Sequence, residues 1–129
     1  MIDQSVLERI ERIKRIMRDQ RRVELVDAEV LARSAKGVLG VHRSRVNLAT
    51  RAFSSMGHST PAELELAAQR VLESSLEAAR AERSAEQSER VVRVASTARV
   101  EAERELRGIS LTKVRMIRVA SARDHRAET

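Results

Sequence analysis

The 129-residue sequence contains no cysteine, tryptophan or tyrosine, and it has one phenylalanine (Phe53) and one proline (Pro61). Without cysteine the chain forms no disulfide and has no thiol chemistry, so a reducing compartment is compatible with it. Large side chains that could fill a thick core are scarce, because most of the apolar residues are Ala and Val. The composition therefore favours a two-helix seam over a multilayer globule.

Long apolar runs are also missing. The segment Met1–Ser5 has neither the basic nor the apolar region of a secretory signal. Apolar runs elsewhere are only a few residues long, far short of a membrane span. From these absences we expect a cytoplasmic protein with no membrane insertion.

Charged residues and helix formers are abundant instead. Asp, Glu, Lys and Arg make up 34% of the chain, the net charge is +6, and all but three of the 25 basic residues are Arg. This composition, with little Gly or Pro, is typical of long helices and coiled coils. The basic excess favours an acidic partner, whether protein, nucleic acid or lipid headgroup.

One short segment divides the chain into two helical stretches. Thr60, Pro61 and Glu63 suit the N-cap, N1 and N3 positions of a capping box. Gly57, just upstream, can take a positive φ and end the preceding helix. Because so short a connection usually joins antiparallel neighbours, we predict a hairpin turn near residues 54–62.

The sequence therefore predicts an all-α fold, a long antiparallel two-helix coiled-coil hairpin that forms a single domain over residues 1–129. The first helix is expected at about 4–55 and the second at about 61–122, followed by a loose C-terminal tail. The second helix is the longer, so its apolar end should project past the N-terminus.

The apolar positions of the first helix form an imperfect stripe. Its most regular members are Ile10, Ile13 and Met17, and this register continues to Leu31, Val38 and Val41. A second series, Ile16, Val23 and Val30, follows at heptad spacing, which indicates a seam that drifts and needs further partners. In the second helix, residues 77–90 offer only alanines as apolar side chains and are predicted not to hold a core together on their own.

Gly37 and Gly40 lie inside the first helix, where each costs about 1 kcal/mol relative to Ala. Two explanations are open: close approach of the second helix, or a hinge that would make three helices. We expect a continuous helix that can bend at Gly37–Gly40.

Opposite charges gather on the two sides of the turn. Residues 33–62 carry five basic and no acidic side chains, whereas residues 63–90 carry seven acids and four arginines. Folding at residues 57–59 is predicted to set these blocks against each other, and to fix register more than stability. The predicted pairs are Arg51 with Glu65, Arg43 and Arg45 with Glu73 and Glu77, and Arg33 and Lys36 with Glu82 and Glu86.

No catalytic, cofactor-binding or metal-binding residue stands out. His42, His58 and His125 are far apart in the sequence, no phosphate-binding glycine motif is present, and carboxylates alternate with arginines. Because a two-helix hairpin offers no concave pocket, we expect a protein that is not an enzyme.

Several non-enzymatic roles remain open. A positive tip with uncovered apolar side chains is expected where the termini meet, because both terminal segments have a basic excess. A nucleic-acid-binding coiled coil is the Arg-rich alternative, although no aromatic residue interleaves the arginines. Self-association into a dimer or four-helix bundle is another. The residues expected to bind a protein partner at the tip are Ile10, Arg12, Ile13, Arg15, Leu106, Arg107 and Met116.

The opening residues Leu7–Ile16 and the closing residues Val100–Ile109, with a charged Ala-rich middle, resemble the stalk proteins of flagellar and type III secretion export, the FliJ/YscO-like family. The resemblance lies in length, composition and architecture. It implies a helical hairpin that acts as the central stalk of a type III export ATPase, engaging the ATPase ring and the export gate. The aromatics often seen in the middle of such proteins are missing, which bears on the gate contact.

Overall fold

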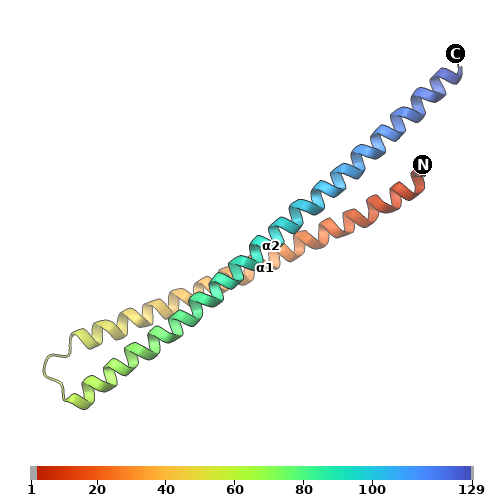
Figure 1. The fold of residues 1–129 in the computed structure, drawn as a ribbon. Coiled ribbons are helices and arrows are strands. Elements are labelled where there is room, and N and C mark those ends of the chain that lie inside the picture. Colours follow the sequence, from red (N-terminus) through yellow and green to blue (C-terminus); the bar gives the residue numbers. More distant parts are fainter. Residues whose placement is uncertain (1–2, 129) are drawn as a thin grey trace. The chain divides into compact units, whose positions relative to one another are not determined.

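The computed structural model describes residues 3–128 and consists of two long helices that pack against each other. Helix α1 spans Gln4–Ser54 and helix α2 spans Pro61–Glu128. Figure 1 shows the two helices running antiparallel, joined by a short turn. The prediction of an all-α helical hairpin is confirmed.

Helix α1 is continuous over 51 residues and passes through both of its glycines. The N–H of Leu7 donates to the carbonyl of Asp3 at 3.0 Å, so Asp3 occupies the N-cap position. A Cβ added at Gly37 or Gly40 would meet nothing within 4 Å. The three-helix alternative is therefore wrong, and so is close approach of α2 as the reason for these glycines, which point away from it.

The turn, Ser55–Thr60, ends α1 without a left-handed residue. The hydroxyls of Ser54 and Ser55 donate to the carbonyls of Thr50 and Ala52, at 2.9 and 3.1 Å. Gly57 has no positive φ, so the predicted glycine cap is wrong. The N–H groups of Ser55 and Met56 donate to the carbonyls of Arg51 and Phe53. With the Ser55 hydroxyl, they satisfy the last carbonyls of the helix without an αL glycine motif.

Helix α2 begins as the sequence predicts. The hydroxyl of Thr60 accepts a hydrogen bond from the N–H of Glu63 at 3.2 Å, and Pro61 is the first helical residue. Proline is favourable there because its missing N–H would have no partner within the helix. The cap fixes the point at which the chain reverses.

Helix α2 ends later than predicted. It continues to Glu128, whereas we expected an end near residue 122 and a loose tail. Residues 121–128 contain no Gly or Pro and are rich in Ala and Arg, so nothing in them stops the helix. Thr129 lies outside the described residues.

Contacts divide the hairpin into two units. The turn unit is Asp27–Val92, and the terminal unit combines the described residues up to Val26 with those from Arg93 onward. Each unit pairs a segment of α1 with a segment of α2.

The seam of the turn unit is built largely from alanine. Ala81 and Ala85 of α2 are buried against Leu39 of α1, with Ala35 packed beside them. Residues 77–90 thus take part in a core, but they do so together with Leu39 and Ala35 of α1 and not on their own. Small side chains allow the two helices to approach closely there. The buried and half-buried positions include a heptad series: Ala28, Ala32, Ala35, Leu39, His42, Val46 and Ala49 on α1, and Leu64, Ala67, Val71, Ser74, Ala78, Ala81, Ala85, Ser88 and Val92 on α2.

The seam of the terminal unit continues the heptad spacing with charged side chains. Leu7, Ala102 and Leu106 are buried, and so is Glu11. The other buried or half-buried positions in its heptad series are Lys14, Arg18, Arg21, Leu25, Ala95, Arg99, Ile109, Lys113 and Met116.

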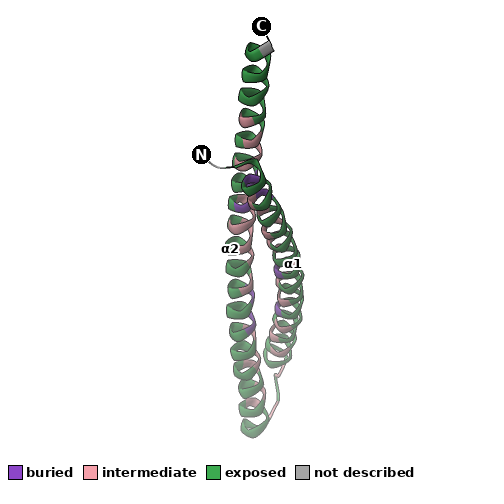
Figure 2. Ribbon diagram, turned by 90° about the vertical axis from the view of Figure 1, so that its right-hand side faces the viewer, coloured by how far each residue is buried: buried purple, intermediate pink, exposed green. Residues whose placement is uncertain are grey.

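Most large apolar side chains of α1 lie outside both seams and are exposed, and most of the α1 ribbon in Figure 2 is accordingly green. Of the predicted stripe only Ile10 and Met17 are half-buried, whereas Ile13, Leu31, Val38 and Val41 are exposed. Ile16, Val23 and Val30 are exposed too. The predicted stripe of α1 is therefore wrong in its register, because alanines and ion pairs, rather than the largest apolar residues of α1, face α2.

Candidate partner-binding surface

Ion pairs cross the seam of the turn unit on one flank. Lys36 lies 3.9 Å from Glu89, and Arg43 lies 3.8 Å from Glu82. Nδ1 of His42 lies 3.7 Å from Glu77 and forms an ion pair only when the imidazole is protonated. The basic and acidic blocks thus face each other, as predicted.

The individual partners differ from those we predicted. Lys36 was expected opposite Glu82 and Glu86, and Arg43 opposite Glu73 and Glu77, but each pairs further along α2. Long side chains lean toward the N-terminus of their own helix. In this hairpin, α1 side chains therefore lean away from the turn and α2 side chains lean toward it. A residue of α1 consequently meets a residue of α2 that lies further from the turn than simple reflection about the turn predicts.

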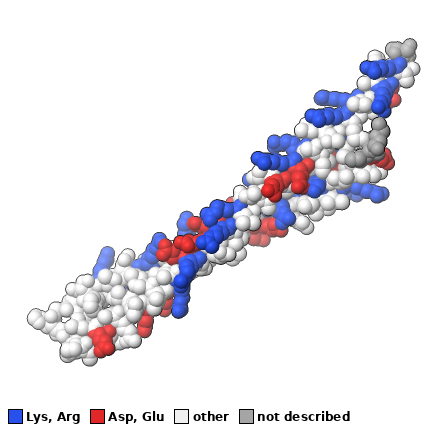
Figure 3. Space-filling view, viewed as in Figure 1, with Lys and Arg blue, Asp and Glu red and all other residues white. Residues whose placement is uncertain are grey.

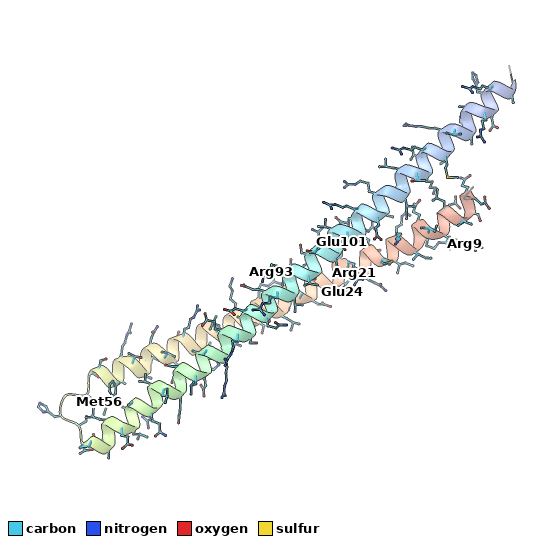
Figure 4. All side chains as sticks on the ribbon, in the orientation of Figure 1. Arg9, Arg21, Glu24, Met56, Arg93 and Glu101 are labelled. Carbon is cyan, nitrogen blue, oxygen red and sulfur yellow. The ribbon has the colours of Figure 1, made fainter. Side chains whose placement is uncertain are left out.

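A denser network crosses the terminal unit. Lys14 pairs with Glu105 at 2.8 Å, and Glu103 accepts from both Arg22 and Arg99, at 3.1 and 3.2 Å. The hydrogen bond from Arg22, together with the charge and hydrogen bond of Arg99, lowers the pKa of Glu103 below its ordinary value. On α1 itself, Arg21 pairs with Glu24 at 2.9 Å (Figure 4).

Glu11 is the one buried carboxylate among the described residues. It pairs with Arg15 one turn along α1 and with Lys113 of α2, whose Nζ lies 3.4 Å from Glu11 Oε2. A buried ion pair at a heptad seam position fixes register more than it adds stability.

All seven residues predicted at the partner-binding tip belong to the terminal unit. Arg12, Ile13, Arg15 and Arg107 are exposed, and Ile10 and Met116 are half-buried. Leu106 is buried, with only 8% of its surface exposed, and therefore packs in the seam, where it is not accessible to a partner.

The predicted turn residues gather at the closed end of the hairpin. Gly57, Thr60 and Glu63 lie at or beside the turn. Next to them is a hollow of about 520 Å³ between the two helix ends. It is lined by Leu48, Ala49, Ala52, Met56, Glu63, Leu66, Ala67 and Arg70, and Figure 4 labels Met56 at its edge.

The far end of α2 carries an apolar ridge that the predicted site residues do not include. Figure 1 shows that α2 extends past the start of α1, as we expected from the helix lengths. Leu111, Val114 and Ile117 are exposed there at intervals of three residues. The apolar spacing was visible in the sequence, but the prediction favoured Leu106 and Met116, which belong to the seam.

Basic side chains flank this apolar ridge. Arg107, Arg115 and Arg118 are exposed, and the sequence has no Asp or Glu between Glu105 and Asp124. Figure 3 shows Lys and Arg gathered toward this end of α2, on the face in view. An apolar ridge edged by unopposed guanidinium groups is a surface suited to a protein that offers apolar side chains and carboxylates.

Within the described residues, we also searched for membrane-spanning helices and for metal-binding clusters. None of their helices has the length and apolar character needed to cross a membrane. Among the same residues no cluster of three His, Cys, Asp or Glu could hold a metal ion. Comparisons of the chain with models of protein families, with curated proteins and with solved structures find no match.

Proposed function

We propose that this chain is a non-enzymatic helical adaptor that binds a protein partner through the far end of α2. The observation that carries the proposal is the exposed ridge of Leu111, Val114 and Ile117 on a helix end that extends past α1. Exposed apolar side chains arranged in this way favour burial by another protein.

The charge around the ridge favours one kind of partner. Arg115 and Arg118 have no Asp or Glu within five residues in the sequence, so a partner gains most by supplying Asp or Glu around an apolar groove. In its most specific form, the partner is the ring of a type III secretion or flagellar export ATPase, and the hairpin is its central stalk. The resemblance of Leu7–Ile16 and Val100–Ile109 to stalk proteins supports this form.

The test combines residue-specific cross-linking with purified components. A photo-reactive amino acid at position 114 should capture one partner in the source cell, identified by mass spectrometry. Leu111→Asp and Val114→Asp should abolish binding to the purified export ATPase hexamer of the same organism. Val94→Asp is the matched control, because Val94 is an exposed valine of α2 in the same unit.

Two outcomes would count against the proposal. Equal binding by Leu111→Asp and the wild type would show that the ridge is not the docking surface. Salt-dependent binding to a random-sequence DNA duplex, lost on replacing Arg115 and Arg118, would instead assign the basic end of α2 to nucleic acid.

A further inference from the structure

A second heptad series occupies the outer face of α1 in the terminal unit. Its positions alternate by three and four residues, as those of the seam do, and all are exposed. The series consists of Val6, Arg9, Ile13, Ile16, Gln20 and Val23. Side chains repeated at this interval stay on one face of a supercoiled helix, so they suit another helix along their whole length.

The series is apolar at its centre and polar at symmetric places. Ile13 and Ile16 form the middle, Val6 and Val23 form the two ends, and Arg9 and Gln20 lie between. Reversing the series therefore gives the same pattern. A surface that matches its own reverse is what a two-fold symmetric dimer requires, because each copy presents the same patch to the other.

We propose that this outer face of α1 binds the same face of a second copy of the chain, with the two α1 helices antiparallel. The two-fold axis passes between Ile13 and Ile16. Ile13 of each copy packs on Ile16 of the other copy. Val6 then lies opposite the second Val23, and Arg9 opposite the second Gln20. The two hairpins together form a four-helix arrangement with α1 helices at its centre.

Charged residues beside the series select this register. Arg12 and Asp19 lie along one edge, seven residues apart, and both are exposed. Asp19 already accepts from Arg18 at 3.1 Å and has capacity for another donor. In the proposed register each Arg12 comes within reach of the second copy's Asp19.

The two neighbouring heptad registers are disfavoured. Sliding the copies by one heptad in one direction sets Arg12 beside Arg12, and sliding in the other sets Asp19 beside Asp19. Like charges placed side by side at a helix interface repel, which is how natural coiled coils exclude wrong alignments. Apolar spacing and charge thus agree on one arrangement.

This inference is independent of the proposed function, because it concerns α1 rather than the far end of α2. Purified protein without any partner is enough to test it. Sedimentation and light scattering should give twice the monomer mass of 14.5 kDa at micromolar concentration. Ile13→Asp with Ile16→Asp should return the mass to that of one chain, with helix content unchanged by circular dichroism.

Charge reversal makes the test specific. Arg12→Asp alone and Asp19→Arg alone should each weaken the dimer, and the two together should restore it. Leu111→Asp serves as a control that leaves the dimer intact. Spin labels on a cysteine at position 23 should lie about 25 Å apart along the axis in the antiparallel dimer, and side by side in a parallel one, given a rise of 1.5 Å per residue.

A wild type that stays monomeric at the highest soluble concentration would overturn the proposal. So would a dimer that survives the paired Ile→Asp change, or a charge-reversed double variant that fails to recover association. A dimer lost on Leu111→Asp would assign self-association to α2 instead, and would leave the α1 face without this role.

Discussion

Nζ of Lys113 lies 3.4 Å from Oε2 of Glu11, and this contact joins α2 to the one buried carboxylate among the described residues. Arg15 holds the other oxygen of the same carboxylate. Both Glu11 and Lys113 stand where a regular coiled coil would place apolar side chains. The terminal unit therefore uses a charged layer where the turn unit uses alanine and leucine.

Replacing Lys113 by Met should lower the free energy of unfolding by about 1–3 kcal/mol, because a buried carboxylate loses one of its two cations. Glu11→Leu combined with Lys113→Leu should recover most of that loss, since an apolar layer needs no ion pair. Urea unfolding followed by circular dichroism measures both. The single variants Glu11→Leu and Lys113→Leu serve as references. A double variant whose loss of unfolding free energy equals the sum of these two single losses would contradict this account of the layer.

Acid should weaken the terminal unit through Glu103. Arg22 and Arg99 lower the pKa of this carboxyl from its ordinary value of 4.5, so folding favours the ionised form. The stabilisation is complete above pH 4.5 and is lost as the pH falls through the lowered value in the folded chain. Melting temperatures between pH 2.5 and 7 should therefore show a shallower acid decline in Glu103→Gln. Glu101→Gln, an exposed neighbour on α2, should leave the decline as it is in the wild type.

Leu39 and Leu31 offer a comparison of buried and exposed leucine on one helix. Leu39 is 7% exposed and packs on Ala81 and Ala85, whereas Leu31 is 65% exposed. Leu39→Ala should cost about 2–4 kcal/mol of unfolding free energy, because it removes buried methyl groups and leaves a cavity. Leu31→Ala should change stability by about 0.5 kcal/mol or less. Equal losses would mean that α1 faces α2 in another register.

The glycines of α1 should be replaceable with a gain. A Cβ at Gly37 or Gly40 meets nothing within 4 Å, so alanine can enter without a clash. Each Gly→Ala change should raise the free energy of unfolding by about 1 kcal/mol, because alanine loses less backbone entropy in a helix. Thermal unfolding of the single and double variants would measure the gain. A loss of stability at either site would point to a covering surface, such as another chain, over these glycines.

The fold followed from local signals in the sequence. The cap at Thr60, Pro61 and Glu63 marked the chain reversal, and long stretches of helix formers on either side, with only isolated glycines among them, predicted the two helices. These signals act within a few residues, so they can be recognised in the sequence without knowing how the two helices pack. Gly57 was misjudged because the Ser55 hydroxyl and the N–H groups of Ser55 and Met56 satisfy the last carbonyls of α1 instead.

The seam did not follow from hydrophobicity. Ile13 and Val38 are larger and more apolar than Ala35, yet both are exposed while Ala35 packs on the core cluster. A search for the most apolar stripe ranks residues by their free energy of transfer from water. It neglects how closely the backbones of two helices can approach each other. Alanine seams and ion pairs become visible only when both helices are considered together in antiparallel register.

Whether the residues expected at the tip bind a partner stays a prediction, but their exposure differs. Ile13 and Arg107 are exposed in the terminal unit, whereas Leu106 is buried. Leu106 and Leu111 are both leucines of α2, and only the register of α2 against α1 tells which of them faces inward. That register is set by side-chain pairs far apart in the sequence, such as Lys14 with Glu105.

The turn at Ser55–Thr60 also determines the order in which the hairpin can fold. Closing a loop of this size loses little chain entropy, so contacts beside it can form early. Lys14 and Glu105, by contrast, lie 91 residues apart in the sequence. Their ion pair can form only after the contacts between them and the turn have formed. The charged layers of the terminal unit should thus be the last to assemble and the first to open, which leaves the end that carries both proposed interfaces the most readily remodelled on binding.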